Sequence, residues 1–278
     1  MLVSCATLAQ HLSDSSWIVF DCRHELTDLK KGECLYAEGH IPGAHFARLE
    51  TDLSGEKTGK NGRHPLPSPA AFTQFLAQHG VSVHSNVVAY DDAGGPYAAR
   101  LWWLARWIGF DNVHLLDGGI TKWMAEGRAL SRDILAANTT SLQGRPNSRM
   151  TMTAQDVQAR LNDETMILID ARAPERYRGD IEPIDPIAGH IPGSRNHFFK
   201  NNLNTDLTLK APHELHDAFL SLMQKKSPDQ VVHQCGSGVT ACANVFAMEY
   251  AGLKGSRLYA GSWSEWIADP ARPVTIGN

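Results

Sequence analysis

The sequence lacks a long apolar run, a strong excess of charge of one sign and a recognisable targeting segment. No uninterrupted apolar stretch approaches the roughly 18 residues that a membrane-spanning helix needs. Lys and Arg number 26 against 30 Asp and Glu, so bulk charge predicts binding neither to nucleic acid nor to an anionic membrane. The first residues lack the basic and apolar blocks of a signal peptide. These absences predict a cytoplasmic protein that binds no membrane and no nucleic acid.

Cysteine is also scarce, because the 278 residues contain five and none of them forms a Cys-x-x-Cys pair. An odd number of cysteines without this spacing argues against a disulfide scaffold and against a structural zinc site. Reduced thiols are typical of a reducing compartment, which agrees with the cytoplasm. The remaining question is whether one of these thiols is reactive.

What the sequence does contain is an internal repeat. Four segments of the first half recur in the same order in the second half, at offsets of 143 to 150 residues. The matched pairs are 17–23 with 166–172, 39–43 with 189–193, 87–91 with 231–235, and 116–119 with 259–262. Collinear matches at a nearly constant offset indicate a duplicated domain. We therefore expect domains over residues 1–135 and 151–278, joined by a polar linker over 136–150.

Within each copy, short apolar runs alternate with segments of helical spacing. Strands are expected over 17–21, 87–91, 113–117, 166–170, 231–235 and 257–260, and helices over 70–79, 98–108, 213–224 and 240–250. Strands that alternate with helices predict an α/β fold in which each domain is a mainly parallel sheet flanked by helices. The repeated Asp-x-Arg at the end of one strand in each copy predicts a structural ion pair.

Cys235 is the strongest candidate for a functional residue. It lies where a predicted strand ends and a predicted helix begins, and parallel α/β sheets bind ligands at the carboxyl ends of their strands. Gly236 and Gly238 let the loop turn tightly and point backbone N–H groups inward. This field, with the start of the helix, favours a thiolate and makes Cys235 a predicted nucleophile. The alternative is an inert cysteine buried at the end of a strand.

The first copy has Asp91 at the position that matches Cys235. A carboxylate cannot replace a nucleophilic thiolate, so we expect one active site per chain and a catalytically inert first domain.

The doubled domain, the two Gly-His-Ile-Pro-Gly motifs, the Asp-x-Arg strand ends and the Cys235 loop together resemble the two-domain rhodanese-like sulfurtransferases over nearly the whole chain. The resemblance implies tandem rhodanese-like domains, of which the second is catalytic. It implies that Cys235 takes sulfur from a small-molecule donor as a persulfide, without a metal or other cofactor. The sulfur then passes to cyanide or to a thiol, such as a small thiol or a thioredoxin-like protein. Backbone N–H groups of Gly236, Gly238, Val239 and Thr240 would hold the persulfide.

The residues after the cysteine distinguish two branches of this family. Relatives that use thiosulfate typically carry Arg and Lys there, whereas this chain has Gly236 and Ser237, as in the branch that uses 3-mercaptopyruvate. A neutral loop with a hydroxyl group suits a carbonyl or a leaving thiolate. The expected donor is therefore 3-mercaptopyruvate, with pyruvate as the product, and the alternative is thiosulfate, with sulfite as the product.

A donor with a carboxylate needs a cation, and the resemblance points to Arg176. The alternative is that Arg176 belongs to a charged surface segment. The mercaptopyruvate branch typically has a second Arg about nine residues later, but Asp185 stands there in this chain. Either another cation replaces that second Arg, for which Arg63 is a candidate, or the donor differs.

The resemblance also implies a relay of serine, histidine and an acid. Ser237 matches its serine and His64 its histidine, while Glu50 stands where the family has Asp, with Asp52 as a nearby alternative. His64 would polarise the Ser237 hydroxyl so that the departing enolate is protonated. The alternative for His64 is a loop histidine without a catalytic role.

Two other classes of protein can be weighed against a sulfurtransferase. Phosphatases of related fold need an Arg six residues after the cysteine, and Ala241 in that position excludes them. A non-enzymatic regulatory module or persulfide carrier would be indicated by loss of the cysteine in both copies, but Cys235 is retained. A carrier role beside an enzyme activity stays open.

Overall fold

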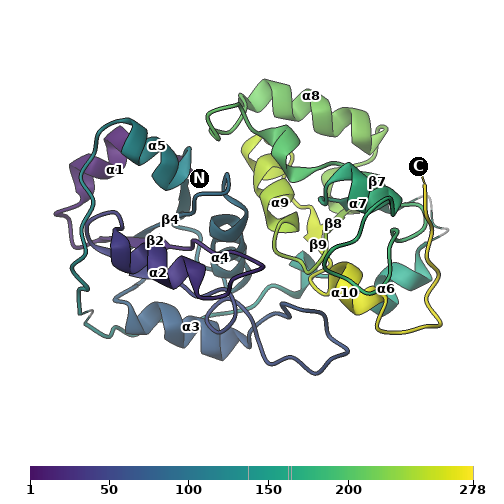
Figure 1. The fold of residues 1–278 in the computed structure, drawn as a ribbon, viewed down its shortest axis with the longest axis horizontal. Helices are drawn as coiled ribbons and strands as arrows, with labels where there is room; N and C mark the ends of the chain where they lie inside the picture. The colour runs from purple at the N-terminus through teal and green to yellow at the C-terminus, as the bar shows by residue number, and fades with distance from the viewer. Residues whose placement is uncertain (137, 162, 164, 278) are drawn as a thin grey trace. The chain divides into compact units, whose positions relative to one another are not determined.

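The computed structural model describes residues 1–136, 138–161, 163 and 165–277, so residue 137 of the expected linker lies outside the described residues. The chain divides into two α/β units, each with its own parallel sheet (Figure 1). The first contains Met1–Gly55, Pro67–Asn147 and Leu203–Leu209, and the second contains Glu56–Leu66, Ser148–Asn202 and Lys210–Asn278. Two short segments, Glu56–Leu66 and Leu203–Leu209, thus belong to a different unit from the residues on either side of them in sequence.

The sheet of the first unit has the strand order β1-β5-β4-β2-β3, and all its pairings are parallel. Its strands are β1 (Leu2–Val3), β2 (Trp17–Asp21), β3 (Ala44–Phe46), β4 (Asn86–Tyr90) and β5 (Val113–Leu116). Its helices are α1 (Cys5–His11), α2 (Lys31–Glu38), α3 (Pro69–Gln78), α4 (Pro96–Trp107) and α5 (Gly119–Ala125). Strands and helices alternate along the chain, which confirms the predicted α/β class.

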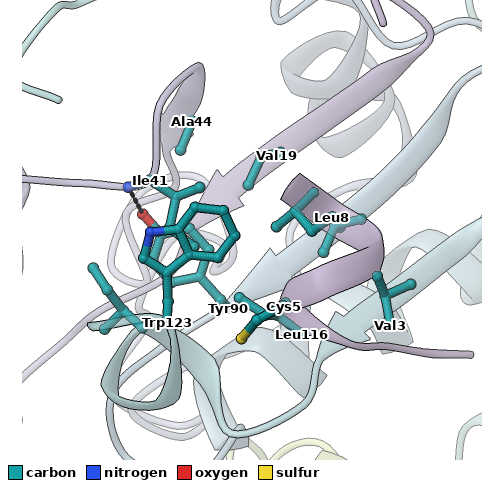
Figure 2. Close-up of a cluster of buried hydrophobic side chains, with 11 residues drawn as sticks. Val3, Cys5, Leu8, Val19, Ile41, Ala44, Tyr90, Leu116 and Trp123 are labelled. Atoms are coloured by element: carbon teal, nitrogen blue, oxygen red, sulfur yellow. Dashed lines mark hydrogen bonds between the residues drawn. The ribbon is translucent and has the colours of Figure 1, made fainter. Parts of the chain in front are cut away.

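A buried hydrophobic cluster joins this sheet to two of its helices (Figure 2). Val19 of β2 and Leu116 of β5 lie in it with Leu8 of α1 and Trp123 of α5. Leu8 is fully buried, and Trp123 is only 2% exposed. Burying an aromatic or aliphatic side chain of this size contributes about 1.5–3 kcal/mol, so these contacts hold the helices against the sheet.

The second unit repeats this plan with the strand order β7-β6-β8-β9, again with parallel pairings. Its strands are β6 (Ile167–Asp170), β7 (Arg195–Asn196), β8 (Val231–Gln234) and β9 (Arg257–Leu258). Its helices are α6 (Ala154–Ala159), α7 (Pro174–Arg178), α8 (Pro212–Met223), α9 (Ala241–Tyr250) and α10 (Ser262–Trp266), with 3-10 turns η1 (Ser148–Met150), η2 (Phe199–Asn202) and η3 (Pro228–Gln230). None of the helices in the described part of the chain is long and apolar enough to span a membrane.

Both units bury the ion pair that the repeated Asp-x-Arg predicts. Arg23 binds Asp21 with an N–O distance of 2.5 Å, and Arg172 binds Asp170 at 2.7 Å. Each guanidinium also donates a hydrogen bond of 2.8 Å to the carbonyl of the first glycine in the Gly-His-Ile-Pro-Gly motif of its own unit. The two repeated motifs therefore form one structural element, in which the arginine joins the end of a strand to the following loop.

Buried histidines are expected to make this fold sensitive to acid. His233 of β8 is fully buried, and burial, with a contribution from His197, lowers its pKa to about 3. Burial likewise lowers the pKa of His45 and of His114 to about 4, helped by His79 and the terminal amino group respectively. In the unfolded chain these groups titrate near pH 6.5, so below that pH the unfolded state binds protons that the folded state cannot bind.

The free energy of unfolding should therefore fall between about pH 6.5 and 4, by about 1.4 kcal/mol per pH unit for His233 alone. Above pH 6.5 these three histidines should not make the free energy of unfolding depend on pH. Denaturant titrations from pH 8 to 4 measure this slope. His233→Leu should reduce this slope, whereas the same change at exposed His213 should leave it unaltered. An equal slope in parent and His233→Leu proteins would contradict the prediction.

Candidate active site

Cys235 follows strand β8 directly and opens the loop that leads into helix α9. Its side chain is almost completely buried, with 2% of the residue exposed. The backbone N–H of Gly238 donates a hydrogen bond of 3.1 Å to the Cys235 Sγ atom. A sulfur that accepts an amide hydrogen bond at the carboxyl end of a parallel strand is in the place where thiolate chemistry is expected.

Gly238 can be replaced by no other residue without a change in the loop. Its φ angle is +77°, and a Cβ atom there would lie 2.1 Å from the carbonyl oxygen of Ala260. Val239 and Thr240 complete the loop, and their carbonyls accept the N–H groups of Cys242 and Ala243 at the start of α9. The loop geometry thus depends on a glycine at the position that points its N–H at the sulfur.

Ser262 is a residue of this site that sequence reasoning missed. Its hydroxyl accepts the N–H of Cys235 at 3.1 Å and donates to the Tyr259 carbonyl at 2.9 Å. The matching residue of the first copy is Gly119, and both residues have a positive φ, +55° for Ser262 and +57° for Gly119. A serine at the position where the first copy has glycine is a signal that comparison of the repeats could have found.

Ser237 and His64 are brought together although they lie 173 residues apart in sequence. The hydroxyl of Ser237 and the Nδ1 atom of His64 share a hydrogen bond of 2.8 Å, and both residues are buried. His64 belongs to the segment Glu56–Leu66, which the second unit includes. Two of the three predicted relay residues are therefore in contact.

Glu50, the predicted third member of the relay, belongs to the first unit. One of its carboxylate oxygens lies 4.0 Å from the Nε2 atom of His24. The alternative acid, Asp52, accepts hydrogen bonds from the Arg48 backbone at 2.8 Å and the Thr51 hydroxyl at 3.0 Å.

Arg63 and Arg176, the two predicted cations, lie beside the loop that follows Cys235. A Cβ atom at Gly236 would be 2.9 Å from Nη2 of Arg63 and 3.6 Å from Nη2 of Arg176. The absence of a side chain at Gly236 therefore lets both guanidinium groups approach the loop. An anion bound at this edge of the loop could contact both cations.

Asp185 lies between these two arginines. One oxygen of its carboxylate forms an ion pair with Nη1 of Arg63, and the other is 3.1 Å from Nη2 of Arg176. Arg176 also binds Glu182 at 2.7 Å. Burial raises the pKa of Asp185, and the charges of the two arginines oppose this shift. Burial also disfavours ionised Glu182, but the hydrogen bonds from Arg176 and from the Asp185 backbone lower its pKa overall.

The corresponding loop of the first unit contains Asp91, whose residue is 1% exposed. Its carboxylate accepts four backbone N–H bonds of 2.8 to 3.0 Å, from Ala93, Gly95, Tyr97 and Ala98. Burial raises the pKa of Asp91 to about 6, although these hydrogen bonds act against the shift. In this loop the inward amides are hydrogen bonded to a side chain of the loop itself.

Comparison with known proteins agrees with the duplicated domain. The profile of the rhodanese-like domain matches residues 4–126 and again residues 153–269. A probable 3-mercaptopyruvate sulfurtransferase of Pseudomonas aeruginosa is 47% identical over 279 residues, covering 100% of this chain and 98% of that protein. A putative thiosulfate sulfurtransferase of Mycobacterium tuberculosis is 38% identical over 284 residues, with coverages of 100% and 98%.

Among solved structures, the chain is similar to SseA from Escherichia coli, described as a 3-mercaptopyruvate sulfotransferase. The two share 28% sequence identity with a TM-score of 0.81, over 94% of this chain and 98% of SseA. Both copies of the repeat thus have the expected architecture. The chain belongs to the family of proteins built from rhodanese-like domains, and it contains two of these domains in tandem.

Proposed function

We propose that this protein is a sulfurtransferase that uses 3-mercaptopyruvate as its donor and Cys235 as its nucleophile. The observation that carries the proposal is the hydrogen bond of 3.1 Å from the Gly238 N–H to the Cys235 sulfur, in a loop at the carboxyl end of β8. An amide directed at the sulfur stabilises negative charge on it, both as the thiolate and as the persulfide anion. The 47% identity to a probable 3-mercaptopyruvate sulfurtransferase supports the same donor.

In the first half of the reaction, the Cys235 thiolate attacks the sulfur of 3-mercaptopyruvate. An S–S bond forms, the C–S bond of the donor breaks, and its electron pair goes to the carbon as the enolate of pyruvate. The enolate takes up a proton, and the new persulfide loses the proton that the donor thiol carried, so atoms and charge balance. In the second half, an acceptor thiolate or cyanide attacks the outer sulfur and Cys235 leaves as a thiolate.

Ser237 and His64 supply the proton in this scheme. Their hydrogen bond of 2.8 Å allows a proton to move from the imidazole through the hydroxyl to the departing enolate. Glu50 stays the predicted acid of the relay.

Arg63 and Arg176 bind the carboxylate of the donor in this proposal. Guanidinium groups offer paired N–H donors that match a carboxylate, and both groups lie against the loop at Gly236. The first domain, with Asp91 in place of the cysteine, is proposed to be inert. A cytoplasmic location, where thiols stay reduced, remains part of the proposal.

Thiosulfate is the second candidate donor, because two cations beside the loop also suit an inorganic anion. The putative thiosulfate sulfurtransferase that is 38% identical to this chain favours the same possibility. Thiosulfate would transfer its outer sulfur to Cys235 and leave as sulfite.

The donor is tested by steady-state turnover with both compounds, measured as release of pyruvate and of sulfite, in the parent protein and in Ser237→Ala. We expect the parent to prefer 3-mercaptopyruvate. In Ser237→Ala, kcat with 3-mercaptopyruvate should fall about 10- to 100-fold, because general acid catalysis is lost. With thiosulfate kcat should change less than about threefold, because sulfite leaves without needing that proton.

The thiosulfate reaction is the internal control, since a general disturbance of the Cys235 loop would slow both donors equally. A parent enzyme that prefers thiosulfate would overturn the donor assignment. An equal loss of kcat with the two donors would overturn the role of Ser237.

A further inference from the structure

The position of Asp185 gives the predicted donor site an internal carboxylate. The Asp185 side chain is 3% exposed, whereas the side chains of its partners Arg63 and Arg176 are 28% and 16% exposed. The carboxylate thus lies in the protein interior, and the two guanidinium groups are nearer to solvent. An anion that arrives from solvent can contact the arginines, but it does so in the field of Asp185.

Asp185 also balances the charge of a larger cluster. The cluster contains three cations, Arg63, Arg172 and Arg176, and three anions, Asp170, Glu182 and Asp185. Arg172 joins its two halves, because its Nη1 atom lies 3.4 Å from Glu182 while its Nη2 atom binds Asp170. With all six groups ionised the cluster has no net charge, so only the local charge of the two arginines, reduced by Asp185, attracts an anion to the loop at Gly236.

The electrostatic energy between a fixed charge and a ligand is proportional to the charge of the ligand. One buried carboxylate next to the binding arginines therefore weakens the binding of dianions more than that of monoanions. The increase in log Kd is twice as large for a dianion as for a monoanion. Near neutral pH, 3-mercaptopyruvate and pyruvate carry one negative charge, and thiosulfate carries two.

We propose that Asp185 is a specificity-determining residue, which favours monoanionic carboxylate donors over dianionic inorganic donors at the Arg63–Arg176 pair. The inference rests on the proposed function, because it places the donor at these two arginines. The inference goes beyond that function, because it assigns the selection between donors to Asp185, a residue that pairs with both of the cations beside the loop.

The test removes the charge and keeps the shape, with Asp185→Asn. Binding of pyruvate and of thiosulfate is measured by calorimetry at low ionic strength in a Cys235→Ser background, so no sulfur transfer is needed. We expect Asp185→Asn to tighten the binding of pyruvate about threefold and that of thiosulfate about tenfold, the square of the first factor to within the accuracy of the measurement.

Asp180→Asn is the matched control. It removes one negative charge from the same chain segment, but Asp180 is 52% exposed and pairs with Arg178 in solvent. The affinity for both anions should stay within about 1.5-fold of the parent value, because exposed charges are screened.

Three results would overturn the proposal. Equal factors for the two anions would mean that Asp185 excludes ligands by its shape and not by its charge. Weaker binding of both anions would mean that Asp185 only holds the arginines in position. Failure of Asp185→Asn to bind either anion would mean that the cluster is not an anion site.

Asp185→Ser, which is neutral and smaller, replaces Asp185→Asn if that variant does not melt cooperatively. It should likewise change log Kd for thiosulfate twice as much as log Kd for pyruvate. Failure of the proposed function has a different signature, because it would appear as absence of turnover by the parent enzyme. The binding ratio does not depend on turnover.

Discussion

Cys235→Ser is expected to abolish sulfur transfer and to leave the fold intact. A serine hydroxyl stays protonated near neutral pH and cannot form a persulfide, so kcat/KM should fall by about 10⁴-fold or more with either donor. Its oxygen can still accept the Gly238 N–H that the sulfur accepts, so the melting temperature should stay close to that of the parent protein. Pyruvate and sulfite release measure the loss, and mass spectrometry after donor treatment shows whether one sulfur atom has been added.

Cys34→Ser is the matched control for this prediction. Cys34 is exposed, whereas Cys5, Cys22, Cys235 and Cys242 are buried, so Cys34 is the thiol that reagents in solution reach most readily. The Cys34→Ser protein should keep full turnover and still gain the sulfur atom. A Cys235→Ser protein that turns over normally, or that gains a sulfur atom to the same extent as the parent protein, would show that the nucleophile is a different residue.

Gly238→Ala is expected to have the second largest effect, and on two quantities at once. The new Cβ would lie 2.1 Å from the Ala260 carbonyl oxygen, so the loop must move and the Gly238 N–H must leave the Cys235 sulfur. Loss of one such donor to a developing anion typically costs about 10² to 10³-fold in kcat. The positive φ of +77° adds about 1–2 kcal/mol of backbone strain, which should lower the melting temperature as well.

Gly252→Ala separates the two effects of this substitution. Gly252 has a φ of +84°, but a Cβ there would meet nothing within 4 Å, so the strain is similar and the clash is absent. The Gly252→Ala protein should be destabilised by backbone strain of similar size to that in Gly238→Ala, and it should keep its kcat. If Gly238→Ala turned over at the rate of Gly252→Ala, the amide at position 238 would have no part in the chemistry.

Much of the fold could be predicted from local patterns. Apolar runs of about five residues, bounded by Asp or Gly, correspond to β2, β4, β5, β6 and β8 within about one residue at either end. Ser68 before Pro69 marks the start of α3, where the serine hydroxyl accepts the N–H of Ala71 at 3.1 Å. These elements could be predicted because each has enough residues to show a period or a cap.

Other elements have no such signal. Strands β1, β7 and β9 contain two residues each, so no period can be read from them. They are defined by pairing with neighbours, as when Leu2 pairs with Leu115. The predicted strand over 257–260 is shorter in the structure for this reason, because only Arg257 and Leu258 pair with β8.

For the site, the sequence by itself determined which groups are present: a cysteine between a strand and a helix, two glycines, a serine, a histidine and two arginines. Local residue order is enough for this, because loop conformation and helix starts depend on neighbouring residues. Only the tertiary structure decided which of these groups meet. His64 reaches Ser237, and Arg63 reaches Asp185, across 173 and 122 residues respectively. Such contacts depend on how distant segments pack, which no local pattern records.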